Sequence, residues 1–408
     1  MSHRDNMNKE LKVKLGVFRN DRRAFYSFII LATLFVLTLP AEILCNIRPL
    51  IIVVDGKPYF PIAVTYSEKD FGGSLPSEPD YKSKNFINLL SGTSTSKPTN
   101  TEDSGLGLDL GDFEDDDDEN VPVTTYEPLS KNLENSPRDF WMLWPPVRYD
   151  YKYIPTESVT GNVVLAAPYQ SKSPIGQGLV ESSWIDGHYL GTDDRGRDVL
   201  ARLIYGFRIS MLFGVSLAIT GTLIGCLIGG TQGFFGGWVD LGGQRLTEIW
   251  GSIPRLYILI ILSSFLVPSA LLLFLILNLT AWMGIAAYIR AEFLKIRNYE
   301  FVKAAKSLGV SNFKIMRRHI LPNALTPVLT FFPFEVTAGI LALVSLDFLN
   351  LGVPSPAPSL GELLAQGKNN LHALWILLPT FAILSLAITL LTFIGEGVRN
   401  AFDPRKTL

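Results

Sequence analysis

The sequence predicts an all-α polytopic membrane protein with six transmembrane helices and an external domain inserted between the first two. Of its 408 residues, 48% are hydrophobic and only 18% are charged, whereas soluble domains carry about 25% charged residues. The charges are segregated, because long stretches carry almost none and one stretch is strongly acidic. These observations argue against an ordinary soluble protein. A nucleic-acid binder is also excluded, since the net charge is −2 and no polar domain is basic.

Six apolar segments approach the roughly 20 residues that a helix needs to cross a bilayer. They cover residues 25–44, 211–232, 249–267, 269–289, 324–346 and 373–395. The third is the least regular, because Pro254 and Arg255 lie near its start, where an arginine head can reach the interface. The first is too long for the apolar core of a signal peptide, and no small-x-small cleavage site follows it. We therefore expect it to remain as a membrane anchor.

Basic residues near the ends of these segments set the orientation. Residues 1–23 contain seven Lys and Arg against three Asp and Glu, and residues 290–322 contain eight against two. The basic N-terminal stretch lies in the cytoplasm by this rule. Six crossings then place residues 290–322 and the C-terminus there too. The predicted parts are a cytoplasmic segment 1–24, a first helix 25–45, an external domain 46–208, a membrane domain 209–395 that includes the cytoplasmic loop 290–322, and a cytoplasmic tail 396–408.

The sequence of the external domain predicts a β-hairpin and a disordered stretch. Asp55-Gly56 separates short apolar runs at 50–54 and 59–62, and Asp-Gly suits a type I′ turn. Residues about 91–138 are rich in Ser, Thr, Pro, Asn and acid, a composition that cannot bury enough apolar surface to fold. A calcium loop is disfavoured there, because the alternating Asp pattern with a distal Glu is absent. We therefore expect a disordered acidic insertion.

An amphipathic helix is predicted just before the second crossing. Thr192 or Asp193 can cap it, and apolar residues recur at helical spacing from Val199. Four arginines surround its apolar face: Arg195, Arg197, Arg202 and Arg208. We expect this helix to lie at the membrane surface. Direct contact with a substrate is the alternative.

The second crossing carries a stripe of glycines at Gly221, Gly225, Gly229 and Gly233. A spacing of four places them on one helix face, and small residues let transmembrane helices approach closely. The stripe therefore predicts helix packing in a multi-helix bundle and indicates no particular function.

Glu335 is the acidic residue that lies deep within a predicted crossing, two residues after Pro333. A carboxylate at that depth is costly and should face the bundle interior or water. Two interpretations stay open: a position on a translocation path, or a protonated acid hydrogen-bonded to a neighbouring helix.

The sequence shows no catalytic or metal-binding constellation. Cys45 and Cys226 lie in or beside apolar segments, and neither H-E-x-x-H nor G-x-S-x-G occurs. The glycine-lysine stretch at 361–369 lacks the spacing and the Ser or Thr of a P-loop. We expect a chain that is not an enzyme, binds no cofactor or metal and hydrolyses no ATP. Energy for any transport would then come from a partner or an ion gradient.

The stretch 290–322 predicts a helix–turn–helix outside the membrane. Gly309 ends the first helix and Ser311 can cap the second. A small apolar face on the first helix is formed by Val302, Ala304, Ala305 and Leu308. Such a face is shallow enough to fit a groove of a partner. A solvated connector is the alternative, and composition does not decide between them.

These motifs together resemble the inner-membrane permeases of ABC importers, in the oligopeptide, dipeptide and nickel branch. Ala304-Ala305 with Gly309, followed by Leu321-Pro322-Asn323, resembles the cytoplasmic coupling loop of that family. The stretches 190–210, 345–352 and 358–362 resemble the same branch. Residues 55–73, 367–371 and 393–404 are similar to the second permease of the Yej-type peptide and microcin C importers. The resemblance covers nearly the whole chain except about 85–138.

The resemblance implies a type I importer permease fold in the inner membrane, with residues 46–208 in the periplasm. It implies a heterodimer with a second permease chain, ATPase subunits that bind ATP and Mg, a periplasmic substrate-binding protein, and a peptide or peptide-like substrate. The residues expected to couple to the ATPase are Val302, Lys303, Ala304, Ala305, Leu308, Gly309 and Pro322. The family commonly has Glu where Lys303 stands, so a salt bridge made by that Glu is not expected here.

Two other classes of function remain at this point. A secondary transporter would be driven by an ion gradient through Glu335. A membrane-anchored sensor would use the external domain and need no ATPase, although six packed crossings exceed what it requires. A neighbouring gene for a Walker-type ATPase would favour the importer.

Overall fold

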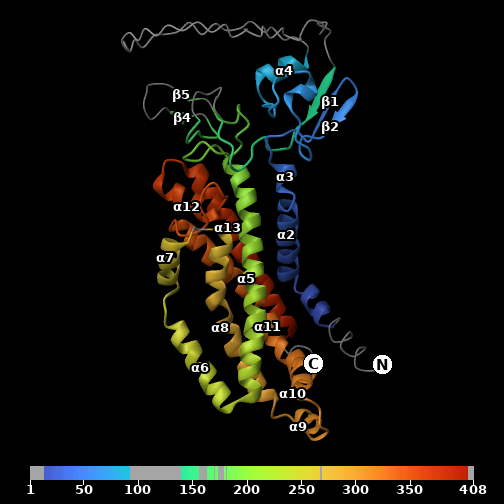
Figure 1. Cartoon of the computed structure of the whole chain (residues 1–408), viewed down its shortest axis with the longest axis vertical. Coiled ribbons are helices and arrows are strands. Elements are labelled where there is room, and N and C mark those ends of the chain that lie inside the picture. The colour runs from blue at the N-terminus through green and yellow to red at the C-terminus, as the bar shows by residue number, and fades with distance from the viewer. Residues whose placement is uncertain are drawn as a thin grey trace, which may run out of the picture. The chain divides into compact units, whose positions relative to one another are not determined.

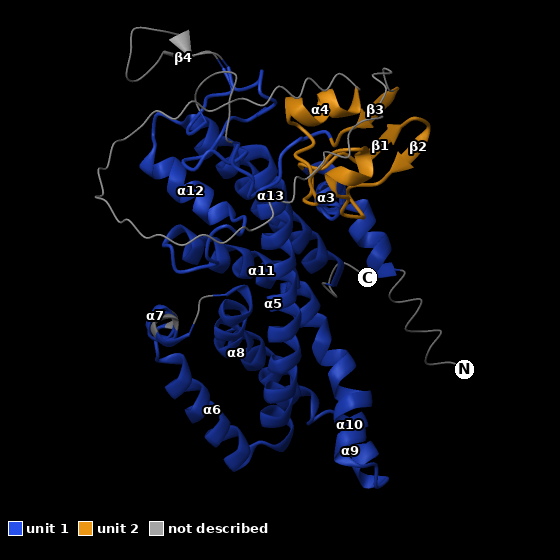
Figure 2. Ribbon diagram, turned by 45° about the horizontal axis from the view of Figure 1, so that its top comes forward, with its two compact units in different colours: residues 1–46, 146–408 blue, residues 47–145 orange. Residues whose placement is uncertain are grey.

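The computed structural model describes residues 13–91, 139–155, 163–169, 171–172, 179–180, 182–266 and 269–402. The chain divides into two compact units, one of residues 1–46 and 146–408 and the other of residues 47–145 (Figure 2). The predicted acidic insertion lies, apart from its first residue, outside the described residues. The same holds for the first half of the predicted N-terminal segment and the end of the predicted tail.

The larger unit is mostly helical, and its long helices α5, α8 and α11 pack side by side (Figure 1). Its helices are α2 (Arg22–Thr38), α3 (Ala41–Leu44), α5 (Val199–Phe235), α6 (Gly237–Gly251), α7 (Arg255–Phe265), α8 (Ala270–Ile296), α9 (Glu300–Ser307), α10 (Asn312–Ile315), the π-helical turn η2 (Met316–Ile320), α11 (Leu321–Phe348), α12 (Leu360–Asn369) and α13 (Leu374–Phe402). A short antiparallel ribbon joins β4 (Ser171–Lys172) to β5 (Leu179–Val180).

Four helical stretches in the described part of the chain are long and apolar enough to cross a membrane. They are Val199–Phe235, Ala270–Ile296, Asn312–Phe348 and Leu374–Phe402, which match the second, fourth, fifth and sixth predicted crossings to within one residue at their starts or enclose them. The first predicted crossing is not one helix, because α2 ends at Thr38 and Pro40 separates it from α3. The third is also divided, since the chain breaks at Pro254 between α6 and the 11-residue α7. Proline explains both breaks, because it cannot donate a backbone hydrogen bond within a helix.

The amphipathic surface helix is a wrong prediction, because α5 runs without a break for 37 residues. That helix and the second crossing are therefore one element. Its N-cap is Asp198, neither Thr192 nor Asp193, and the Asp198 carboxylate accepts a hydrogen bond of 2.7 Å from the backbone N–H of Ala201.

The four glycines of the stripe form the contact between α5 and α8. A Cβ added at Gly225 would lie 2.9 Å from the carbonyl oxygen of Trp282, and one at Gly233 would lie 2.6 Å from that of Arg290. At Gly229 it would overlap the backbone of Ala286. The two backbones thus touch along this face, which only residues without a side chain permit.

Two apolar clusters hold the larger unit together. The main cluster joins α5, α11, α12 and α13, with Leu31 of α2 at its edge. A second cluster, called here the loop core, joins the end of α8 to α9, α10, η2 and the start of α11. The loop core connects the short loop helices directly to two long helices.

The smaller unit contains a three-stranded antiparallel sheet in the order β2-β1-β3, together with the 3₁₀ turn η1 (Glu68–Phe71) and α4 (Lys84–Leu90). The strands are β1 (Ile51–Val54), β2 (Lys57–Tyr59) and β3 (Phe140–Leu143). The predicted hairpin is confirmed, because Asp55 and Gly56 have φ of 50° and 77°, as a type I′ turn requires. The second strand lies earlier than predicted, and β3 was not predicted at all.

Candidate functional site

The loop between α8 and α11 contains α9 and α10, which meet at Gly309. Gly309 has φ of +74°, a conformation that costs little only for glycine. The backbone N–H of Val310 donates to the carbonyl oxygen of Ala305 at 3.2 Å, which closes α9. Ser311 stands before α10 as predicted, but its side chain makes no capping hydrogen bond.

The predicted apolar face of α9 is divided between two sides of the helix. Val302 and Ala305 are buried in the loop core, whereas Ala304 and Leu308 are exposed. The reason is the helical period of 3.6 residues, which turns positions 302 and 305 to one side and 304 and 308 to the other. The four residues therefore cannot all contact the same partner.

An exposed apolar surface, called here the loop patch, is formed by Phe301, Ala304, Leu308 and Phe313. Leu308 is 83% exposed and Phe313 is 72% exposed. Three exposed lysines stand on the same two helices: Lys303, Lys306 and Lys314. Apolar side chains this accessible, rimmed by charge, are typical of a protein interaction site. Sequence reasoning missed both phenylalanines, although Phe301 lies three residues before Ala304 and so shares its face.

Two other residues of the predicted coupling set have local roles. The ammonium of Lys303 lies 3.1 Å from a carboxylate oxygen of Glu300, and both side chains are exposed, so the pair adds little stability. Pro322 lies in the first turn of α11, directly after the π-helical turn η2, and because it has no backbone N–H it interrupts the hydrogen-bond ladder at this junction.

A cavity of about 210 Å³ lies between α5, α8 and α11, and Glu335 is on its wall. Small residues form much of the rest, among them Ala218, Ala281 and Gly284. Glu335 lies two residues after Pro333, and the Thr337 hydroxyl donates a 3.0 Å hydrogen bond to the carbonyl oxygen of Pro333. Glu335 therefore borders a cavity among α5, α8 and α11.

The α5–α12 ion cluster consists of Asp193, Arg197, Arg202 and Glu362. The Arg197 guanidinium lies 2.7 Å from Asp193 and 3.1 Å from Glu362, and Arg202 pairs with the other Glu362 oxygen. Arg197 and Arg202 are only 2% and 0% exposed. Burial lowers the pKa of Arg197, but the carboxylates of Asp193 and Glu362 outweigh this and raise it. These arginines are therefore buried ion-pair partners and do not form the polar face of a surface helix.

Helix α12 is fixed by a second buried carboxylate, that of Asp347 at the end of α11. Asp347 accepts hydrogen bonds from the Ser359 hydroxyl and, at 2.8 Å, from the backbone N–H of Val353. Ser359 in turn caps α12 by accepting from the backbone N–H of Gly361 at 3.1 Å. The sequence assigned no role to Glu362 or Asp347, although both lie in stretches, 345–352 and 358–362, that resemble the importer permeases.

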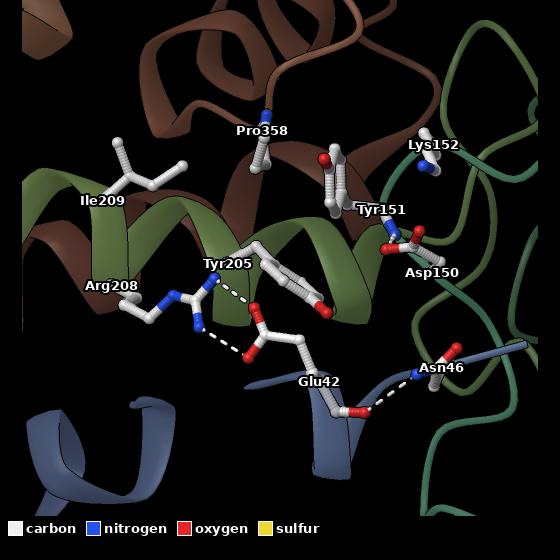
Figure 3. Close-up of a pocket in the computed structure, with 9 residues that line it drawn as sticks. All are labelled: Glu42, Asn46, Asp150, Tyr151, Lys152, Tyr205, Arg208, Ile209 and Pro358. Carbon is white, nitrogen blue, oxygen red and sulfur yellow. Dashed lines mark hydrogen bonds and ion pairs between the residues drawn. The ribbon is translucent and has the colours of Figure 1, made fainter. Parts of the chain in front are cut away.

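A polar pocket of about 290 Å³ lies where α3 meets α5 (Figure 3). The two terminal guanidinium nitrogens of Arg208, Nη1 and Nη2, donate to the Glu42 carboxylate at 2.9 Å each, and Nη1 also donates to the carbonyl oxygen of Leu39 at 2.8 Å. The Tyr205 hydroxyl donates to the carbonyl oxygen of Cys45 at 3.2 Å. Burial raises the pKa of Asp150 on the same wall. The ion pair and the hydrogen bonds around this pocket therefore hold the chain after α2 against α5.

Residues 221–408 match the family described as the binding-protein-dependent transport system inner membrane component. The chain is also 42% identical, over 396 residues, to the peptidoglycan transport system permease protein YejE of Agrobacterium fabrum, covering 96% of this chain and 92% of that relative. The chain belongs to the ABC importer permease family. As an inner-membrane permease it crosses the membrane several times, and it is a transport component without catalytic activity of its own.

Two further relatives support the same assignment. The inner membrane ABC transporter permease protein YejE of Escherichia coli is 40% identical, with 96% of each chain covered. The oligopeptide transport system permease protein OppC of Escherichia coli is 38% identical over 220 residues, covering 54% of this chain and 73% of that relative. The similarity to the two YejE permeases therefore extends over the smaller unit as well, whereas OppC matches only about half of the chain.

Proposed function

We propose that this permease forms one half of the translocation pathway of an ATP-driven importer for peptides or peptide-like compounds. The loop patch is the observation that carries the proposal, because it presents apolar side chains and lysines on a rigid helix pair. The relatives named for peptidoglycan and oligopeptide transport support this substrate class. Membership of the ABC permease family leaves the ion-gradient alternative without support.

The proposed assembly contains a second permease chain, two ATPase subunits and a periplasmic substrate-binding protein. ATP and Mg bind to the ATPases, since we expect no nucleotide site in this chain. Both termini and residues 290–322 lie in the cytoplasm, and residues 46–208 lie in the periplasm. In the proposed type I arrangement, α2 and the divided pair α6–α7 supply the two remaining crossings.

Movement would pass from the ATPases into the membrane through the loop core. The loop patch binds the ATPase, while Val302 and Ala305 on the other side of α9 belong to the same apolar cluster as residues of α8 and α11. Packed cores move as units and do not deform continuously. Closure of the ATPases would thus displace α9 and α10 together with the ends of both long helices.

Replacing Ala304 by tryptophan should uncouple ATP hydrolysis from uptake. The bulky ring projects from the loop patch without entering the loop core, so the subunit should fold and only its fit to the ATPase should change. We expect substrate uptake into proteoliposomes to fall at least tenfold, while basal ATP hydrolysis by the assembly continues and no longer responds to substrate. A tenfold change corresponds to about 1.4 kcal/mol, within the range of one interface side chain.

Ala63→Trp is the matched control, because Ala63 is exposed in the smaller unit. It should leave uptake unchanged. Ala305→Trp differs, since Ala305 is only 8% exposed, and it should reduce the yield of folded protein. Normal uptake by a fully assembled Ala304→Trp variant would contradict the proposed docking site.

We also propose that Glu335 lies on the translocation path and contacts the substrate. Glu335→Gln removes the charge and keeps the shape, so uptake should fall about tenfold if the carboxylate interacts with a polar group of the substrate. Basal ATPase activity and the melting temperature should not change. Glu396→Gln, at an exposed site on α13, is the control. A lower melting temperature with normal uptake would instead assign Glu335 to helix packing.

A further inference from the structure

An apolar groove of about 440 Å³ lies between the N-terminal helical residues and the end of α13. It is lined by Lys14, Leu15, Phe18, Arg19, Phe25, Phe28, Ile394, Val398, Ala401 and Phe402. Its volume falls in the range of about 300–1,000 Å³ typical of small-molecule sites. The coupling and translocation proposals use none of these residues.

The groove is built by the close crossing of α2 and α13. A Cβ added at Gly397 would overlap Ala24 and lie 3.1 Å from the ring of Phe18, so the two helices touch at that point. The rings of Phe18 and Phe28 pack edge to face at 6.3 Å, and Phe18 and Val398 also contact the main core cluster. The groove therefore has fixed aromatic walls.

The rim of the groove is basic. Lys14 and Arg19 line it, and the Lys14 ammonium lies 4.8 Å from the centre of the Phe402 ring. Arg22, Arg23 and Arg399 are exposed on the same two segments, which carry two acids, Asp21 and Glu396. Asp21 caps α2 by accepting from the backbone N–H of Ala24 at 3.3 Å. The local charge is thus positive by several units, beside a surface that only hydrocarbon can fill favourably.

We propose that this groove binds one phospholipid with an anionic headgroup. An acyl chain fills the space between Phe18, Phe28 and Val398, and the lipid phosphate pairs with Lys14 and Arg19. The groove lies at the end of a candidate membrane span, α13, where a lipid of the adjoining leaflet can enter. An anionic headgroup matches the basic rim, whereas a water-soluble anion would leave the apolar walls unfilled.

Native mass spectrometry of the full-length permease, purified with the subunits that accompany it, tests the proposal. Phosphatidylglycerol and phosphatidylethanolamine with identical acyl chains are titrated separately, and the affinity for the first bound lipid is measured. We expect phosphatidylglycerol to bind at least tenfold more tightly. The measurement in detergent depends neither on orientation nor on transport, so its failure would leave the proposed function untouched.

The double variant Lys14→Gln/Arg19→Gln should weaken phosphatidylglycerol binding about 25-fold, at about fivefold for each cation. It should weaken phosphatidylethanolamine binding much less, because the ammonium of that headgroup already offsets the charge of its phosphate. Val398→Trp fills the groove and should weaken both lipids. Arg245→Gln, at an exposed site on α6, is the control and should change neither. If Val398→Trp does not fold, the double variant, which leaves the apolar walls unchanged, still decides the question.

Equal affinity of the wild type for the two lipids would overturn the proposal, because any bilayer lipid would then occupy the groove. Unchanged phosphatidylglycerol binding by the double variant would overturn it too. In that case the tight lipid site would lie elsewhere on the protein.

Discussion

Replacing Glu362 by glutamine is expected to lower the free energy of unfolding of the permease by about 3 kcal/mol. Glu362 pairs with both Arg197 and Arg202, and its side chain is 15% exposed. The variant leaves two buried guanidinium groups with Asp193 as their remaining carboxylate partner. Removing one partner of a buried pair is costly because the other charge stays desolvated. The melting temperature in detergent and the yield of folded protein should both fall.

The matched control is Glu248→Gln on α6. Glu248 pairs with Arg245, but these side chains are 57% and 72% exposed, so the loss should not exceed about 0.5 kcal/mol. Equal melting temperatures for the two variants would show that the α5–α12 ion cluster is solvated and is not a structural element. A large difference would establish that α12 is anchored to α5 by charge.

Replacing Gly229 by leucine should prevent the bundle from folding. The added side chain would meet the backbone of Ala286 on α8, and a backbone cannot change rotamer to avoid it. Adding atoms to a well-packed core typically costs about 1–3 kcal/mol, and at this contact the helices must also separate along the whole glycine stripe. We expect little or no folded protein by size-exclusion chromatography.

Gly242→Ala controls for the loss of a glycine in a helix. A Cβ at Gly242 would meet nothing within 4 Å, and alanine is favoured over glycine in a helix by about 1 kcal/mol. Its melting temperature should be equal to or higher than that of the wild type. A folded, active Gly229→Leu variant would show that α5 and α8 do not need backbone contact.

Local patterns predicted some elements well. The Asp55-Gly56 turn could be predicted because its backbone conformation depends on two adjacent residues. The glycine stripe could be assigned to packing because a spacing of four fixes one helix face. The strand β3 could not be predicted, since it pairs with β1 from more than 80 residues away in the sequence and depends on tertiary contacts.

The charged residues were harder to predict. Arg197 and Arg202 favoured a surface helix because arginine is rarely buried, and their partner Glu362 is some 160 residues away. The burial of these two arginines therefore could not be predicted from the sequence alone. On α9, the composition gave an apolar face, but only the helical period together with the loop core shows which half is exposed. The loop patch was thus half predicted, through Ala304 and Leu308, and half missed, through Phe301 and Phe313.

The unbroken length of α5 also has a mechanical consequence. Its 37 residues span about 55 Å, well beyond a hydrocarbon core of about 30 Å. One end is clamped in the α5–α12 ion cluster, and at the other Arg297 donates to the carbonyl oxygens of Gly233 and Phe234 at 3.2 and 3.3 Å. Such a rod acts as a lever: tilting it by about 10° around its midpoint swings the two ends about 5 Å in opposite directions. A force applied near Arg297 would therefore move the opposite end of α5, at the ion cluster, in the opposite direction.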